Sequence, residues 1–216
     1  ISRLPFKCPA APYEAALILD ALLRERGLRH RTQIELYTPE AMPIAIAGPG
    51  AAAHLTDYLR LRGITLSTNH HLQAVDGSSR QLSFQDGIRA DYDLLVAVPP
   101  HLPPAVLRGT PLASEAGWVQ ADYATLATRV EKVYAIGDVA AVTLPSGRPL
   151  PKAGIFAQGA AEVVAHNIAV QVRRRGHPKA YVATGGCHLE TGDGQAFYIT
   201  GDFSAAPQPA VVLQGP

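Results

Sequence analysis

Cys8 and Cys187 are the residues of this sequence best suited to redox chemistry, and they are its only cysteines. Cys8 follows Lys7 and lies a few residues before a predicted helix. The dipole of that helix and the charge of the lysine both favour a thiolate at such a position. Two cysteines are too few for a disulfide scaffold, so they are either unrelated buried thiols or a functional pair.

Asp138 is a second candidate, because it follows Gly137 at the end of an apolar run. The run at 132–136 predicts a buried strand, and the glycine permits a sharp turn or a close approach to a ligand. Asp138 would then lie at the carboxyl end of a parallel strand, where open α/β sheets bind ligands. Its carboxylate is either an acceptor for sugar or ribityl hydroxyls or only a turn residue, and the spacing leaves both open.

A long helix is predicted at 153–174, directly after Lys152. The free N–H groups and the positive dipole of its first turn suit a partial negative charge, such as the N1–C2=O edge of a reduced flavin. The ammonium of Lys152 would add a full charge there. The first half of the helix is rich in Ala and Gly, which permit close packing against a sheet or a flat ligand.

The helices and strands predicted in the first part of the chain follow a parallel α/β pattern, and they must position these residues. Helix and strand are predicted to alternate at 13–26, 32–38, 51–62 and 64–66. Asp20 and Arg24 are four residues apart and are predicted to pair on the outer face of the first helix.

Further strands are predicted at 71–75, 80–84, 88–92, 93–98, 181–188 and 194–200. The first three form a meander, whereas the run at 93–98 is continuously apolar and predicts burial on both faces. The Gly-Asp-Gly sequence at 192–194 predicts a hairpin turn between the last two strands. The tail at 204–216 shows little pattern.

Composition and charge restrict the classes of function. The 216 residues suffice for one large or two small domains, and a hydrophobic content of 47% indicates a globular protein. The net charge is +1, and no basic block indicates nucleic-acid binding. The arginines at 173–175 are predicted to offset exposed carbonyls at a helix end. His70, His71 and His188 lack metal-ligand partners at useful spacing, so no metal site is predicted.

Residues 134–139, together with 151–154 and 157–160, resemble the second FAD motif of two-dinucleotide-domain flavoprotein oxidoreductases. The resemblance implies FAD as the cofactor, with the motif's aspartate on the ribityl chain and the following helix directed at the isoalloxazine ring. The residues that it assigns to cofactor binding are Gly137, Asp138, Lys152, Ala153, Gly154 and Ile155.

The start of the chain lacks the features of an NADH site. NADH-using members of these families open the second domain with a glycine-rich loop, which lets backbone approach the pyrophosphate. This chain has no glycine from 1 to 26, and Pro9 and Pro12 remove amide donors. The strand at 32–38 ends at Thr38 without a carboxylate placed to hold a ribose. NADH binding is therefore disfavoured.

The segment at 7–14 resembles the redox-cysteine segment of sulfide:quinone oxidoreductases and of the flavoprotein subunit of flavocytochrome c sulfide dehydrogenase. Residues 98–101, 186–190 and 202–207 resemble the same families. The resemblance implies that Cys8 and Cys187 take up sulfide sulfur as a disulfide or polysulfide. Electrons would pass through FAD to a quinone, or to a cytochrome c in the flavocytochrome form. Glu14 is the candidate proton acceptor near Cys8.

The resemblance also implies an α/β, Rossmann-like, two-domain FAD/NAD(P)-binding flavoprotein fold whose N-terminal FAD-binding half is missing. We expect a degenerate NAD(P)-like domain at 1–104, the C-terminal part of the FAD-binding domain at 105–175, and an interface segment with the second cysteine at 176–216. The chain does not begin with Met. We therefore expect a fragment that is inactive alone and does not bind FAD tightly.

The partners implied for the full-length enzyme are sulfide and a quinone, with peripheral membrane contact through a missing C-terminal segment and a homodimer as the assembly. The expected location is cytoplasmic, at the periphery of the inner membrane, or periplasmic for the flavocytochrome form. Two alternatives stay open. One is an NADH:quinone or pyridine nucleotide-disulfide reductase, and the other is a redox-inert scaffold of the same fold, which would need neither cysteine.

Overall fold

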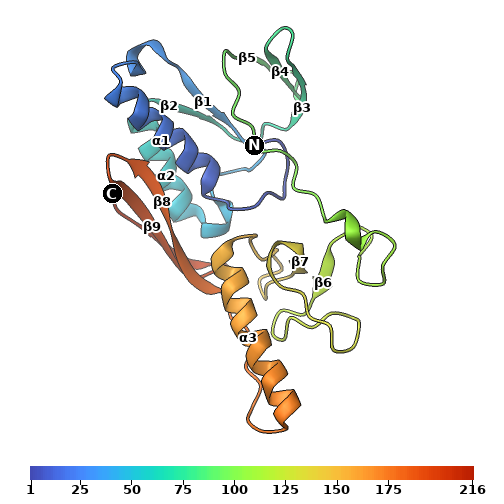
Figure 1. The fold of residues 1–216 in the computed structure, drawn as a ribbon. Coiled ribbons are helices and arrows are strands. Elements are labelled where there is room, and N and C mark those ends of the chain that lie inside the picture. Colours follow the sequence, from blue (N-terminus) through green and yellow to red (C-terminus); the bar gives the residue numbers. More distant parts are fainter. The chain divides into compact units, whose positions relative to one another are not determined.

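The computed structural model describes all 216 residues. They form two compact units (Figure 1). The first unit comprises Ile1–His101, His188–Ile199 and Val212–Pro216, and the second comprises Leu102–Cys187 and Thr200–Val211. None of the helices is both long enough and apolar enough to cross a membrane.

The first unit begins with the predicted alternation of helices and strands. Its elements are α1 (Ala11–Glu25), β1 (Ile34–Tyr37), α2 (Pro49–Leu61) and β2 (Ile64–Ser67). The two strands pair in parallel, with Ile34 opposite Ile64. Both helices bury one face, through Leu17 on α1 and through Leu55 on α2, and neither of these side chains is exposed at all. The apolar spacing that predicted the helices is therefore the spacing that builds the core.

A three-stranded antiparallel sheet follows in the first unit, as the meander pattern predicted. It consists of β3 (Leu72–Asp76), β4 (Gln81–Phe84) and β5 (Arg89–Asp91). Short 3-10 helices occur at Arg29–Arg31 and Ala45–Ala47 in this unit, and at Ala105–Leu107 and Gly137–Val139 in the second.

The predicted buried strand at 93–98 is wrong. The segment has no strand structure, and the side chains of Leu94 and Val96 are 76% and 70% exposed. The Val98 carbonyl accepts both the N–H and the hydroxyl of Ser2, at 3.1 and 2.6 Å. An apolar run becomes a strand only where a neighbouring backbone pairs with it, and no strand of this chain does so here.

The second unit contains a short parallel pair and the longest helix. β6 (Val119–Ala121) pairs with β7 (Ala140–Val142), and α3 (Gly154–Arg173) follows. Phe156 of α3 is buried and meets Phe203 edge to face, with 5.0 Å between the ring centroids. The predicted helix at 153–174 is confirmed within one residue at each end.

The predicted strand at 132–136 is wrong, and this changes the position of Asp138. The segment has only an isolated bridge between Ala127 and Tyr134 and a bond from the Ala135 N–H to the Leu126 carbonyl. Asp138 lies in the 3-10 turn Gly137–Val139, directly before β7. Because 132–136 has no partner strand, Asp138 does not follow a parallel strand as predicted. It precedes one, β7.

The last three strands are β8 (Thr184–Gly192), β9 (Gln195–Asp202) and β10 (Ala210–Gln214), in the order β10-β9-β8. Residues of each strand belong to both units. The hairpin turn predicted at 192–194 is confirmed. The sequence at 204–216 did not indicate a strand, but β10 lies there and pairs with β9.

Candidate functional site

Cys8 occupies a tight turn immediately before α1. Its φ angle is +54°, a left-handed conformation that costs a residue with a side chain about 1–3 kcal/mol. The Cys8 carbonyl accepts the N–H of Ala11 at 3.0 Å, which joins the turn to the first residue of the helix. The thiol is exposed. Strain of this kind is retained where the surrounding structure fixes it, and it is frequent at reactive positions.

Cys187 lies in β8 and is the last residue of its segment in the second unit. It is also exposed, and neither cysteine forms a disulfide in the structure. From His188 onward β8 belongs to the first unit, where Leu189 and Thr191 are fully buried. The strand therefore anchors firmly just after the cysteine.

Glu14 contributes to this anchoring. Its Oε2 atom accepts the backbone N–H of Glu190 at 2.9 Å, which ties the first turn of α1 to β8. The carboxylate is thus engaged with backbone in this structure. Its predicted role as a proton acceptor for Cys8 stays a prediction.

The tip of the hairpin packs against α1 at Gly192. A Cβ atom added there would lie 2.1 Å from the Cβ of Ala21, so no larger residue fits without movement. The next residue, Asp193, accepts a hydrogen bond from Nη2 of Arg62 at 3.3 Å. Phe197 of β9 is fully buried and contacts Tyr58 of α2 edge to face, at 4.9 Å between centroids.

Asp138 and the start of α3 form the candidate flavin side of the second unit. Gly137 has a φ angle of +73°, and a Cβ there would lie 3.6 Å from the Cβ of Ala157, so the turn packs closely on the helix. The half-buried carboxylate of Asp138 forms no hydrogen bond within the chain. The N–H groups of Gly154 and Ile155 have no acceptor within the chain, and no side chain caps the helix. The Asp138 carboxylate can therefore accept hydrogen bonds from ligand hydroxyls. The free N–H groups at the start of α3 can donate to a partially negative ring edge.

Lys152 is held more tightly than the sequence suggested. Its Nζ atom donates to the carbonyls of Asp138 and Ala140, at 2.5 and 3.2 Å, and lies 3.9 Å from the ring centroid of Trp118. Burial lowers the pKa of the lysine, while the nearby charge of Asp138 opposes this shift. Nothing in the sequence indicated the contact with Trp118, because the two residues are far apart along the chain.

The cavity beside this turn is too small for a flavin. Its volume is about 10 Å³, which is the space of a single water molecule. Apolar residues line it, including Leu126, Val142 and Phe156. The second unit therefore offers Asp138 and the helix amides to a flavin, but it does not enclose the ring.

A buried polar cluster closes the carboxyl end of β1 in the first unit. Tyr13 donates its hydroxyl to Oε2 of Glu40 at 2.5 Å, and Thr38 donates to the same atom at 3.1 Å. Burial raises the pKa of Glu40 above its ordinary value, although the hydrogen bonds act in the opposite direction. Sequence reasoning missed this pair. Because the carboxylate is satisfied internally, it is not available to hold the ribose of a dinucleotide.

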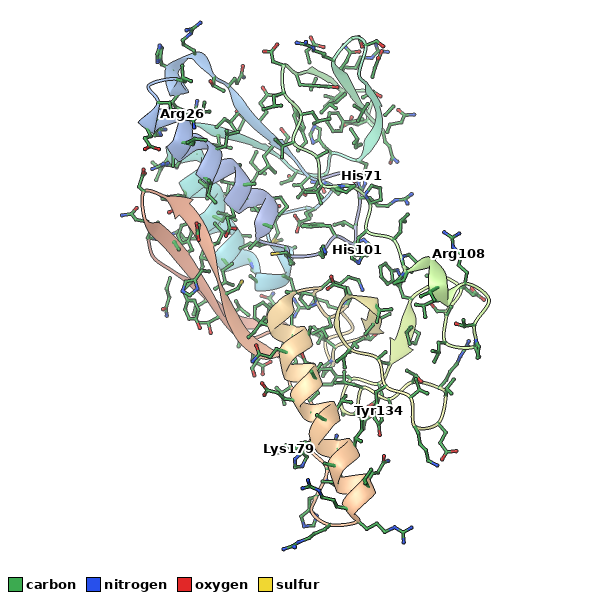
Figure 2. All side chains as sticks on the ribbon, viewed as in Figure 1. Arg26, His71, His101, Arg108, Tyr134 and Lys179 are labelled. Carbon is green, nitrogen blue, oxygen red and sulfur yellow. The ribbon has the colours of Figure 1, made fainter.

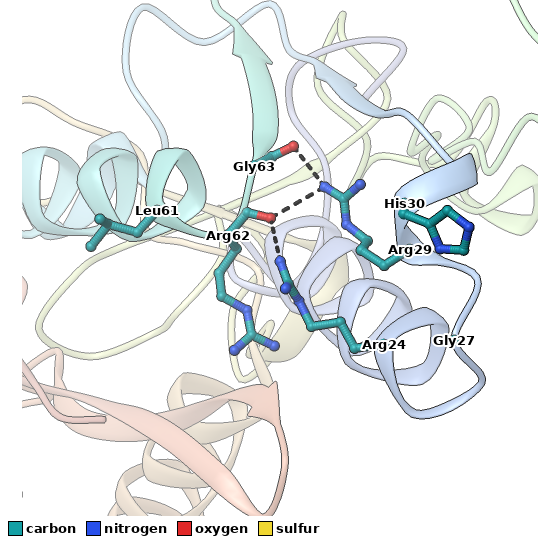
Figure 3. Close-up of a pocket in the computed structure, with 7 residues that line it drawn as sticks. All are labelled: Arg24, Gly27, Arg29, His30, Leu61, Arg62 and Gly63. Atoms are coloured by element: carbon teal, nitrogen blue, oxygen red, sulfur yellow. Dashed lines mark hydrogen bonds between the residues drawn. The ribbon is translucent and has the colours of Figure 1, made fainter.

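A pocket of about 580 Å³ lies in the first unit where α1 and α2 end (Figure 3). It is lined by Arg24, Gly27, Arg29, His30, Leu61, Arg62 and Gly63. Arg24 and Arg29 both donate to the Arg62 carbonyl, at 3.0 and 3.2 Å. All three guanidinium groups also bond to the carboxylate of Asp20, which is completely buried.

This arginine cluster serves the fold. Burial alone would raise the pKa of Asp20, yet the three arginine hydrogen bonds lower it below its ordinary value. The prediction that Asp20 and Arg24 pair is confirmed at 2.8 Å, but the predicted outer-face location is wrong because Asp20 faces the core. The positive charges are balanced by two helix ends and by Asp20 and Asp193.

Comparison with known proteins places these features in context. Residues 14–174 match the sequence profile of the family described as pyridine nucleotide-disulphide oxidoreductase. The mitochondrial sulfide:quinone oxidoreductase of Mus musculus is 26% identical over 210 residues, covering 94% of this chain and 45% of the relative. The corresponding protein of Dictyostelium discoideum is 27% identical over 147 residues, covering 66% of this chain and 32% of the relative.

Solved structures share the fold. The sulfide:quinone oxidoreductase of Aquifex aeolicus superposes with a TM-score of 0.80 at 21% identity, over 96% of this chain and 51% of that one. A chain of the Tetrahymena thermophila mitochondrial ATP synthase structure gives a TM-score of 0.70 at 18% identity, over 94% and 49%. This chain therefore spans about half the length of these structures, and less than half of either sequence relative.

Proposed function

Because this chain belongs to the pyridine nucleotide-disulphide oxidoreductase family, we propose that it is part of an FAD-dependent enzyme that oxidises sulfide and reduces a quinone. The observation that carries the proposal is the turn at Cys8. An exposed thiol in a left-handed conformation stands directly before α1, at the place where NADH-using members have a glycine-rich loop. The similarity to sulfide:quinone oxidoreductases over 94% of the chain supports the same assignment.

In the proposed reaction, Cys8 and Cys187 act as a pair. Hydrosulfide attacks one sulfur of their disulfide, the S–S bond breaks, and the products are a persulfide on one cysteine and a thiolate on the other. When the disulfide re-forms, zero-valent sulfur and two electrons are released. The quinone receives these electrons together with two protons, one from hydrosulfide and one from solvent.

The second unit would provide part of the cofactor site. FAD, when bound, supplies a two-electron acceptor next to the cysteines. Asp138 would accept hydrogen bonds from its ribityl hydroxyls, and the free N–H groups of Gly154 and Ile155 would face the electron-rich edge of the ring. Gly137 and Lys152 shape and support this turn, and the Ala153 carbonyl accepts the N–H groups of Phe156 and Ala157 at the start of α3. Glu14 would act as the proton acceptor through its second carboxylate oxygen, because only Oε2 accepts the N–H of Glu190.

The decisive test uses single substitutions, Cys8→Ser and Cys187→Ser, in the full-length protein. Sulfide is mixed with the oxidised enzyme, and loss of the flavin absorbance is followed without added quinone. We expect each substitution to slow this reduction by at least about 100-fold, as loss of a nucleophile does. Glu25→Gln, an exposed change at the end of α1, serves as the control and should leave the rate unchanged.

Normal reduction by sulfide in both cysteine variants would overturn the proposal. If NADH reduces the flavin as fast as sulfide does, the enzyme is instead an NADH-dependent reductase. If neither sulfide nor NADH reduces the flavin, the protein is a redox-inert scaffold. We also propose that the 216-residue chain alone does not retain FAD after desalting, because the cavity beside the Asp138 turn has room for only about one water molecule.

A quinone is dissolved in the membrane, so we propose that the full-length enzyme is peripheral to a membrane and faces the cytoplasm. A form that reduces cytochrome c would lie in the periplasm instead. The corresponding measurement is whether the full-length protein binds to isolated membranes and is released from them by salt.

A further inference from the structure

Gly185 lies two residues before Cys187 in β8, and its lack of a side chain lets the strand pass directly over α3. A Cβ atom added at Gly185 would lie 2.6 Å from Cγ1 of Ile155, which is closer than ordinary van der Waals contact. β8 therefore begins beside the first turn of α3 (Figure 2). The φ angle of Gly185 is +155°, a conformation that also disfavours a residue with a side chain.

The residues just before Gly185 are fixed over the same helix. Tyr181 is buried, and its hydroxyl donates to the carbonyl of Phe156 at 3.4 Å. Ala183 is fully buried, and its carbonyl accepts the N–H of Phe203 at 2.9 Å. The ring of Phe203 in turn meets that of Phe156. Because the chain is held on this side, a side chain at position 185 would displace the residues that follow it, and Cys187 is among them.

The helical turn that Gly185 touches is the one that the proposed flavin site uses. The N–H groups of Gly154 and Ile155 have no acceptor within the chain. Cys187 is connected to these free donors through two residues of β8 and one contact with the side chain of Ile155, and all of these residues belong to the second unit. The contact between Gly185 and Ile155 therefore sets where the thiol lies relative to the first turn of α3.

We propose that Gly185 is a positioning residue for Cys187, because it admits β8 onto Ile155 and so sets the separation between the thiol and the start of α3. This inference rests on the proposed function, in which electrons leave the cysteines for a flavin bound at that turn. A misplacement of reacting groups by about 1 Å slows a reaction by about 100-fold. Gly185 has no side chain that could take part in the reaction, so it acts only through the place of the thiol.

The test is Gly185→Ala in the full-length, flavin-loaded protein, with sulfide as the reductant. We expect reduction to be about 10- to 100-fold slower for each molecule of bound flavin. A second readout needs no sulfide, and it is the equilibrium of the Cys8–Cys187 disulfide with glutathione. We expect this equilibrium to move about tenfold toward the reduced thiols, which corresponds to about 30 mV. A loss of folding stability alone would change neither value in the folded protein.

A second substitution separates the contact from the backbone strain. Ile155→Ala removes the atoms that the new methyl group would meet. In that background, Gly185→Ala should slow reduction by a factor about tenfold smaller than it does alone. Gly147→Ala is the matched control, since Gly147 is exposed and also has a positive φ angle, +80°, but nothing lies within 4 Å of its Cβ position. The control should leave the rate and the glutathione equilibrium unchanged.

Two outcomes would overturn the proposal. One is a Gly185→Ala variant in which the rate and the glutathione equilibrium are both unchanged, and the other is an equal loss with and without Ile155→Ala. Normal reduction by sulfide in Cys187→Ser would show instead that the proposed function is wrong. The glutathione equilibrium would then decide alone whether Gly185 positions the thiol.

Discussion

The hydroxyl of Tyr13 donates a hydrogen bond to Oε2 of Glu40 across 2.5 Å, in a part of the first unit that solvent barely reaches. This bond joins the first turn of α1 to the segment that follows β1. Burial raises the pKa of both groups, since each is held away from water. The turn that carries Cys8 is therefore attached to a helix that is itself fixed to the edge of the sheet.

Glu40 should make stability fall as the pH rises. Its folded-state pKa lies above the ordinary value of 4.5, so the folded protein holds a proton that the unfolded chain releases. The stabilising contribution is complete below pH 4.5 and is lost as the pH rises through the folded-state pKa. Glu40→Gln should remove this decline. Urea unfolding of both proteins from about pH 4 to about pH 8 measures it, and parallel curves would contradict the prediction.

Asp20→Asn should destabilise the protein by about 3–5 kcal/mol, because three arginines lose a buried carboxylate. Asp57→Asn is the matched control, since its pair with Arg60 is exposed and contributes less than about 1 kcal/mol. Because the pKa of Asp20 is lowered below 3.8, its contribution is present above that pH and is lost on further acidification. Similar losses for the two variants would show that the arginines find other partners.

Gly192→Ala should destabilise the protein more than Gly194→Ala does. Both glycines have positive φ angles, +82° and +71°, so an alanine at either position costs about 1 kcal/mol in backbone strain. Only the Cβ at 192 meets Ala21, whereas nothing lies within 4 Å of the Cβ at 194. The difference in unfolding free energy isolates this close contact, and we expect about 1–3 kcal/mol. No difference would mean that the hairpin moves away from α1 without penalty.

Lys152→Met should destabilise the second unit by about 1.5–3 kcal/mol, because the carbonyls of Asp138 and Ala140 lose a charged donor. Methionine preserves the length of the side chain. Lys132→Met is the control, since that lysine is exposed and pairs only with the neighbouring Glu131. Hydrogen exchange at the turn before β7 is the measurement, and unchanged protection of its amides would count against a supporting role for Lys152.

Local patterns predicted the helices well. The apolar spacing of α1 and α3, and the glycines that follow α1 and α2, are visible in the sequence and depend on few distant contacts. Strands were predicted less well. Segments 93–98 and 132–136 are apolar enough for strands, yet a strand also needs a paired neighbour, and hydropathy does not reveal whether one is present.

The candidate site was likewise predicted from the sequence only in part. The residue types at Cys8, Asp138 and Lys152 drew attention from the sequence alone, and the structure supplies the left-handed turn, the free carboxylate and the paired ammonium. The bond between Tyr13 and Glu40 spans 27 residues, and no local pattern indicates it. The pairing of Cys8 with Cys187 stays a prediction from family resemblance.

Trp118 is the only tryptophan of the chain, and its ring lies beneath the ammonium of Lys152. Its fluorescence therefore reports on one place in the molecule, the turn that leads into α3. A flavin absorbs light in the range where an indole emits, so a flavin settling beside this turn would dim the emission by energy transfer. The protein thus contains its own optical probe of cofactor arrival, and no label has to be attached.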